Sequence, residues 1–205
     1  MIKHSLLATG LFLILASNNT FAKSGPYIGA GIGGEKSTWD ARDNITGSNV
    51  NFGGTGAVGN LFGGYGEVLN QYFYLGAEGF VGLTSTKGST KKINNTTSNL
   101  KQTYNYGASV IPGVMVTKDT LAYARIGVIR SRFEQDNSRD FIPFHGKTLT
   151  GHQLGVGVRT AITDKVDFQT EYTYSAYQSL GGNGIGSSIK PNDSQVKIGF
   201  VYNFG

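Results

Sequence analysis

Residues 196–204, Val196-Lys197-Ile198-Gly199-Phe200-Val201-Tyr202-Asn203-Phe204, decide the fold of this chain. Apolar side chains occupy every second position, and the residues between them are mostly small or polar. This alternation has the period of two that a β-strand with one apolar face requires. The stretch also matches the roughly 9 to 11 residues with which a tilted strand crosses a bilayer. It predicts a membrane-spanning strand.

The same alternation recurs upstream. It is clear in three segments, at 72–83, 152–162 and 166–174. It is weaker in four more, at 26–34, 54–66, 103–116 and 121–130. Together with 196–204 these segments give an even number of strands, as bacterial single-chain barrels have.

The lengths of the connections predict the topology. Three connections are short, around 67–71, 117–120 and 163–165. Four are long and polar, at about 35–52, 84–101, 131–148 and 176–192. Long and short alternate along the chain, as in a barrel whose short turns and chain ends face the periplasm. The predicted fold class is all-β, an eight-stranded antiparallel up-and-down transmembrane β-barrel.

Composition favours a lipid-facing exterior. The chain has 31 glycines and only 15% charged residues. Glycine weakens both helices and unstrained strands, so this many glycines needs an architectural reason. A secreted, lipocalin-like barrel with an apolar interior is the alternative arrangement of the same strands. However, the polar faces carry Gly, Gln, Glu, Arg and Lys, which suit a narrow lumen. Water would penalise the opposite faces as an outer surface, whereas a bilayer favours them.

The N-terminus has the pattern of a secretory signal. A short basic region at Lys3 and His4 precedes an apolar run at residues 6–16 and the small residues of Thr20-Phe21-Ala22. The apolar run is shorter than the roughly 20 residues of a spanning helix. We therefore expect a signal peptide at 1–22, cleaved after Ala22, and a barrel domain at 23–205. The chain has no cysteine, so it offers no thiol for a lipid anchor and no disulfide.

Several stretches resemble the OmpA-like and opacity-protein-like family of small outer-membrane barrels, without the peptidoglycan-binding domain of its longer members. The resemblance lies in Phe62-Gly63-Gly64-Tyr65 with the turn after it, in residues 116–127, and in residues 157–163 running on to Glu171-Tyr172. The end of the chain, Lys197-x-Gly199-x-x-Tyr202-x-Phe204, is similar to the signal that the barrel assembly machinery reads in that family.

The resemblance and the strand parity together predict a charged lumen. Glu78, Arg125 and Glu171 match inward charges of the family, whereas Ile111, Arg159 and Gln169 depart from its pattern. The parity of the strands gives three inward acids and three inward bases: Glu78, Asp167, Glu171, Arg125, Arg159 and Lys197. Such a cluster either fills the lumen and fixes the strand register, or gates a narrow channel.

The long connections carry the predicted contacts with the surroundings. Trp39 is an aromatic that a binding loop could present, and Lys87, Lys91 and Lys92 form a basic stretch suited to lipopolysaccharide phosphates or polyanionic host glycans. No serine has a suitably placed partner in His145 or His152, so we expect no enzyme. We expect neither a cofactor nor a metal.

The predicted function is an outer-membrane surface barrel that supports envelope integrity and surface interaction, adhesin-like, through its loops. The alternative is a narrow gated pore for ions or small solutes. The expected partners are outer-membrane lipid and lipopolysaccharide, the barrel assembly machinery and host surface molecules, but not nucleic acid. The expected location is the bacterial outer membrane.

Overall fold

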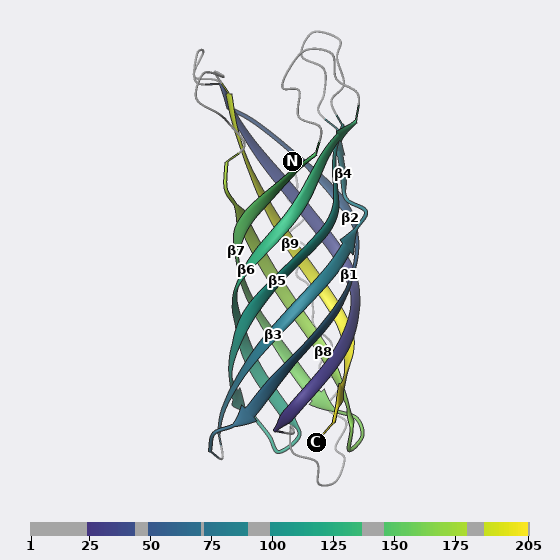
Figure 1. Ribbon diagram of the computed structural model, residues 1–205, viewed down its shortest axis with the longest axis vertical. Coiled ribbons are helices and arrows are strands. Elements are labelled where there is room, and N and C mark those ends of the chain that lie inside the picture. The colour runs from purple at the N-terminus through teal and green to yellow at the C-terminus, as the bar shows by residue number, and fades with distance from the viewer. Residues whose placement is uncertain are drawn as a thin grey trace, which may run out of the picture.

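The computed structural model describes residues 24–43, 49–70, 72–89, 99–136, 146–179 and 187–204, and these are almost entirely β-strand. Figure 1 shows the strands as tilted staves around a common axis. Their bounds are β1 (Gly25–Asp43), β2 (Asn49–Val68), β3 (Phe73–Thr84), β4 (Lys87–Ser89), β5 (Asn99–Met115), β6 (Thr120–Asp136), β7 (Lys147–Ala161), β8 (Val166–Tyr177) and β9 (Ser187–Asn203).

Short β4 prolongs the line of β3, because both strands pair with β2 on one side and with β5 on the other. We call each strand of the barrel wall a stave and count β3 and β4 together as one. The closed sheet therefore has eight staves, and each pairs antiparallel with its neighbours. The predicted fold class is confirmed. No helix in the described part of the chain is long and apolar enough to cross a membrane.

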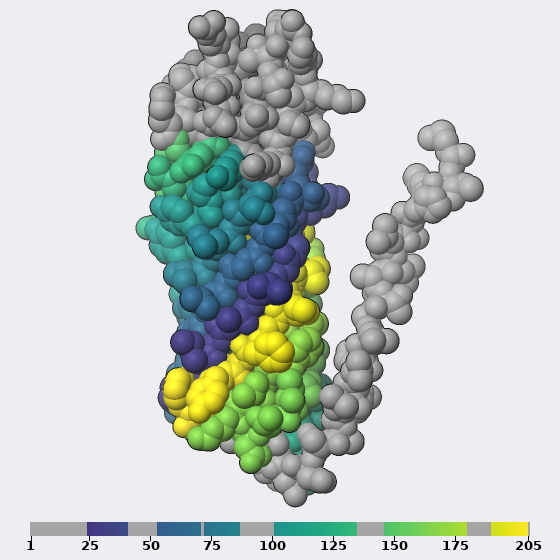
Figure 2. Space-filling model, turned by 90° about the vertical axis from the view of Figure 1, so that its right-hand side faces the viewer, coloured from purple at the N-terminus to yellow at the C-terminus, as the bar shows by residue number. Residues whose placement is uncertain are grey.

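The first and last strands close the barrel. β1 pairs with β9 from Tyr27↔Asn203 to Asp43↔Ser187, and with β2 on its other side. Figure 2 shows the two strands side by side, β1 in purple and β9 in yellow. No stave is left with a free edge, and a sheet surrounded by lipid needs this closure to satisfy its backbone groups.

Three tight turns lie at one end of the barrel, which we call the turn end (Figure 1). Asn70 Oδ1 accepts hydrogen bonds from the backbone N–H groups of Tyr72 and Phe73 at 3.0 Å each. In the last turn Thr163 Oγ1 accepts from the backbone of Lys165 and Val166. In the middle turn Thr117 Oγ1 accepts from the backbone N–H of Asp119 at 3.2 Å. Side-chain oxygens of Asn and Thr favour such turns, so the sequence itself encodes these three reversals.

The outer wall is apolar, as the strand parity predicts. β3 alternates exposed and buried residues along its whole length, and Val196, Ile198 and Phe200 on β9 are 58%, 48% and 58% exposed. Their neighbours Lys197, Gly199 and Val201 face the interior. An apolar band of this kind suits contact with acyl chains.

The strands extend much further than the sequence pattern predicts. Residues 35–43 and 49–52, placed in a long connection, belong to β1 and β2, and residues 131–136 and 187–192 belong to β6 and β9. Here the prediction is wrong, and the reason is physical. Away from the turn end the outward residues become polar, and the inward ones are mostly polar with isolated aromatics such as Trp39 and Phe133, so the alternation that marks a lipid-facing strand disappears.

Candidate functional site

Arg125, on β6, lies at the centre of a buried charge network in the lumen. Its Nη2 lies 2.6 Å from Glu78 Oε1 on β3, and its Nε lies 2.8 Å from Glu171 Oε2 on β8. Lys197 Nζ, on β9, lies 3.3 Å from Glu171 Oε1. These side chains are at most 10% exposed. Buried ion pairs of this kind hold their strands in one register, because separating the two partners leaves a buried charge unpaired.

Arg159 extends the network towards the turn end. Its Nη2 lies 3.8 Å from Glu78 Oε2, and its Nε and Nη2 donate to Gln169 Oε1 at 3.2 and 2.9 Å. Arg159 and Gln169 are direct cross-strand partners on β7 and β8. Two of the three departures from the family pattern, Arg159 and Gln169, therefore lie together and form a charge-assisted hydrogen bond.

Aromatic side chains fill the space beside these charges. The Arg159 guanidinium lies 4.6 Å from the ring centre of Tyr27, a cation–π contact. Tyr27 donates its hydroxyl to Glu78 Oε2 at 3.2 Å, and Tyr123 donates to Glu171 Oε2 at 3.0 Å. Towards the turn end, Tyr123 also belongs to a cluster with Tyr74, Ile111 and Leu121, which packs against Val68 and Met115. The interior of the turn-end half is thus packed with side chains.

The structure brings five of the six predicted lumen charges into one network: Glu78, Arg125, Arg159, Glu171 and Lys197. Asp167 also faces inward, but closer to the turn end, where its Oδ2 accepts a hydrogen bond from Asn203 Nδ2 at 2.8 Å.

A second polar cluster lies further from the turn end, around Glu35 on β1. Glu35 accepts hydrogen bonds from Thr84 Oγ1 at 2.9 Å, Thr86 Oγ1 at 2.5 Å and Gln195 Nε2 at 2.6 Å. The Ser37 hydroxyl lies between the two acids, 2.6 Å from Asp193 Oδ1 and 3.3 Å from Glu35 Oε1. Among the described residues, neither acid forms an ion pair.

Sequence reasoning missed this cluster, although a signal for it exists. Glu35 continues the inward parity of Gly31 and Gly33 on β1, and Asp193 continues that of Lys197 on β9. Glu35 falls in the predicted connection at about 35–52, whereas Asp193 lies between the predicted connection at about 176–192 and the predicted strand at 196–204. The three-against-three charge balance therefore does not hold for the whole interior, because the interior carries these two acids in addition.

The prediction that a binding loop presents Trp39 is wrong. It is fully buried on the inner face of β1, within a cluster that includes Ile129, Phe133 and Leu149. Its parity on β1 is that of Glu35 and Ser37, so an extended strand turns the indole inward. The rings of Phe133 and Tyr177, in the same cluster, meet edge to face at 5.4 Å.

The other candidates divide between described and undescribed residues. Lys87 lies in β4 rather than in a loop, whereas Lys91, Lys92 and His145 lie outside the described residues. In the predicted assembly signal, Tyr202 and Phe204 are exposed on the outer wall with their ring centres 5.2 Å apart, and Lys197 and Gly199 face the lumen. Within the described ranges, no group of three or more His, Cys, Asp or Glu side chains is arranged to hold a metal.

Several solved structures of bacterial outer-membrane proteins have a similar fold. OprG, an outer membrane protein of Pseudomonas aeruginosa, aligns with a TM-score of 0.59 and 16% identity over 90% of this chain and 98% of its own. Neisserial surface protein A aligns at 0.50 with 20% identity over 88% and 98%. The outer membrane protease OmpT of Escherichia coli aligns at 0.51 with 9% identity over 91% and 99%. At these identities the likeness concerns the fold alone, and one fold hosts several activities.

No curated protein matches the chain in sequence. The model of the outer membrane protein beta-barrel domain, however, matches residues 5–204, almost the whole sequence. The described architecture agrees with that match in its closure, its tight turns and its apolar outer wall. The chain belongs to the outer membrane protein beta-barrel domain family and is a barrel of the bacterial outer membrane.

Proposed function

We propose that this protein is a sealed, rigid scaffold of the outer membrane, which supports the envelope and holds its outer connections at the cell surface for interaction. The observation that carries the proposal is the length of the strands. β1 and β2 have 19 and 20 residues, and β5, β6 and β9 have 17 each. A tilted strand needs only about 9 to 11 residues to cross the bilayer.

The extra strand length projects on the side opposite the turn end, which is the outer side, since short turns face the periplasm in this architecture. Its interior is packed around Trp39, Phe133 and Tyr177. A projecting, packed barrel differs from a membrane barrel with long loops because it holds surface segments on a stiff support. Interaction through those segments is the adhesin-like part of the proposal.

The connections between β1 and β2, β4 and β5, β6 and β7, and β8 and β9 are the segments to test. Each is replaced in turn by a short Gly-Asn linker, and the binding of the cells to host cells and matrix is measured. We expect at least one replacement to reduce binding at an unchanged amount of folded barrel. Equal binding by all four variants would remove the surface-interaction role and leave the structural one.

A second candidate function is a narrow gated pore. One observation favours it: among the ion pairs of the described lumen residues, the Arg159–Glu78 contact of 3.8 Å is the longest, so the network would open there first. An eight-stranded barrel is nevertheless barely wider than its own side chains.

Planar-bilayer recordings separate the two functions. A sealed scaffold predicts background conductance for the native barrel and for Glu78→Ala and Arg159→Ala. A gated pore predicts discrete openings in the native protein, which become more frequent when either partner is removed.

A further inference from the structure

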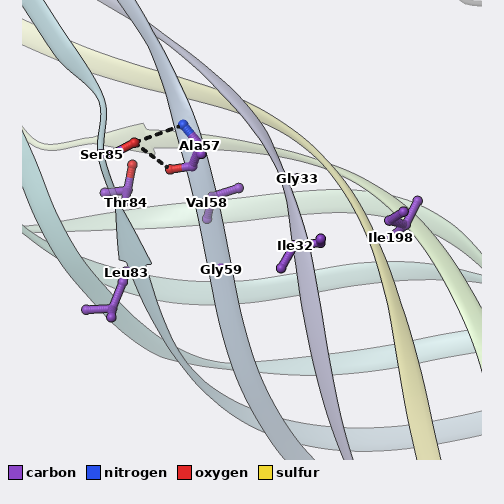
Figure 3. A pocket seen from close by; sticks show the side chains of 9 residues that line it. All are labelled: Ile32, Gly33, Ala57, Val58, Gly59, Leu83, Thr84, Ser85 and Ile198. Atoms are coloured by element: carbon purple, nitrogen blue, oxygen red, sulfur yellow. Dashed lines mark hydrogen bonds between the residues drawn. The ribbon is translucent and has the colours of Figure 1, made fainter.

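A groove crosses the outer wall of the barrel over β9, β1, β2 and β3, with a volume of about 630 Å³. Figure 3 shows Leu83 on one side of Gly59, and Ile32 and Ile198 on the other. The floor consists of Ala57 and Gly59 on β2. A Cβ built on Gly59 would meet only one atom, the Gly31 carbonyl oxygen at 3.9 Å. The groove exists because β2 presents small residues where its neighbours present large ones.

The groove ends at a satisfied polar group. Ser85 Oγ accepts a hydrogen bond from the backbone N–H of Ala57 at 3.1 Å, and the hydroxyl donates back to the Ala57 carbonyl at 3.3 Å (Figure 3). Ser85 therefore offers little to a polar ligand, and the remaining surface is aliphatic. Its place on the lipid-facing wall makes an acyl chain the natural occupant.

A row of lysines lies beyond the groove on the outer side. The outward positions of β1 pass from Ile32 through Gly34 to Lys36. Lys36 pairs with Thr55 on β2, Thr55 with Lys87 on β4, and Lys87 with Lys101 on β5. Since adjacent strands lie about 4.8 Å apart, the row spans roughly 15 Å. Both Lys36 and Lys101 are exposed.

Acids near Lys36 and Lys101 in the described strands have other basic neighbours. The acid opposite Lys101 is Glu134, which already pairs with Arg132 at 2.9 Å. Asp40, the next acid along β1, lies opposite Lys190 on β9. Among the described residues neither Lys36 nor Lys101 forms an ion pair, so both remain available for a phosphate, which a lysine ammonium binds as a point charge.

We propose that the groove and the lysine row form one binding site for a phosphorylated, multiply acylated lipid of the outer leaflet, that is, for the lipid A part of lipopolysaccharide. One acyl chain lies over Ala57 and Gly59 between Ile32 and Leu83, and a headgroup phosphate lies at Lys36 and its neighbours in the row. Charge complementarity and the order of the two parts along β1, apolar first and basic beyond, select this occupant. The inference does not depend on the surface-interaction role proposed above.

Titration of the purified, folded barrel with lipid A in neutral detergent, read by native mass spectrometry, tests the site. We expect one saturable lipid A per barrel. Lys36→Gln and Lys101→Gln should each weaken binding about fivefold, the effect of one lysine near an anionic lipid surface. Ala57→Phe should abolish saturable binding, because the ring occupies the floor of the groove.

Matched controls lie elsewhere on the same wall. Lys147→Gln removes another exposed lysine, and Ala108→Phe adds the same ring at another outward alanine; both should bind lipid A as the native barrel does. If Ala57→Phe fails to fold, shown by loss of the faster-migrating band in unheated gels, Leu83→Ala removes a groove wall without adding bulk and should also weaken binding.

Several outcomes would overturn the proposal. Binding of dephosphorylated lipid A or of phosphatidylglycerol as tight as that of lipid A would show that the site does not recognise lipid A. Equal losses in Ala57→Phe and Ala108→Phe would show that the groove has no role. A lipid-independent dimer that Ala57→Phe dissociates would identify a second copy of the chain as the occupant instead.

Discussion

Arg125 neutralises two buried carboxylates at once, Glu78 at 2.6 Å and Glu171 at 2.8 Å. Replacing it by Met keeps much of its volume but leaves both acids without their shared cation. Removing one partner of a buried pair typically costs about 3–5 kcal/mol. We expect Arg125→Met to lower the free energy of unfolding in urea by that amount.

The control for this prediction is Arg132→Met, which removes an ion pair that is exposed to solvent. Its urea midpoint should equal that of the native barrel, because exposed pairs contribute little. If Arg125→Met also unfolds at the native midpoint, the network fills space without holding the staves together.

Glu35 and Asp193 make a contrasting pair of acids. Glu35 accepts hydrogen bonds from Thr84, Thr86 and Gln195. Asp193 accepts a hydrogen bond from the Ser37 hydroxyl, which lies between the two acids. An amide in place of Glu35 loses charge-assisted bonds worth roughly 1.5–3 kcal/mol each. An amide at Asp193 removes a buried charge close to another of the same sign.

We therefore expect Glu35→Gln to lower the thermal midpoint of the barrel in detergent, and Asp193→Asn to leave it unchanged or to raise it. Both substitutions keep the shape of the side chain, so packing is not at issue. If Asp193→Asn destabilises the barrel as much as Glu35→Gln does, hydrogen-bond donors stabilise the two carboxylates equally, which would contradict this prediction.

At the scale of elements, β9 carries both the lipid-facing stripe and the predicted assembly signal. Ile198 lies in the middle of that stripe and is 48% exposed. Lysine there should cost roughly 2–4 kcal/mol of folding free energy in lipid vesicles, the range measured near a bilayer midplane. The same change at Ser194, nearer the interface on the same strand, should cost much less. Equal costs would place the bilayer elsewhere on β9.

Phe204 and Tyr202 allow a role in assembly to be distinguished from a role in stability. Their rings contact each other on the outer wall at the turn end. If the end of β9 is the signal that the assembly machinery reads, Phe204→Ala should sharply reduce the folded barrel in cells. Refolding of the purified chain into detergent should proceed at the native rate. An equal defect in both assays would make Phe204 a packing residue only.

The elements differ in how far their sequence predicts them. The parity of β3, β8 and β9 follows from apolar stripes that lipid demands, so the inward place of Glu78 and Glu171 could be predicted. Trp39 could not, because beyond the bilayer both faces of β1 carry polar residues and nothing in the pattern distinguishes a projecting strand from a loop. Contacts between strands far apart in sequence, such as Ser37 with Asp193, depend on closure of the barrel.

The whole molecule combines a lipid-facing wall, a packed lumen and a part that projects beyond the membrane. Closure between β1 and β9 makes all three possible, since it leaves no stave with an open edge. The projecting part is formed by long strands rather than by long loops, and this distinguishes the protein from a membrane barrel with long loops.

Labelling of single cysteines with a membrane-impermeant thiol reagent in intact cells tests this arrangement most directly, because the native chain has no cysteine. On β1, Asp40→Cys should react from outside and Ile32→Cys should be protected by lipid. Asp164→Cys, in the last tight turn, should react only after the outer membrane is permeabilised. Reaction of Asp164→Cys in intact cells, or equal reaction of Ile32→Cys and Asp40→Cys, would contradict the account.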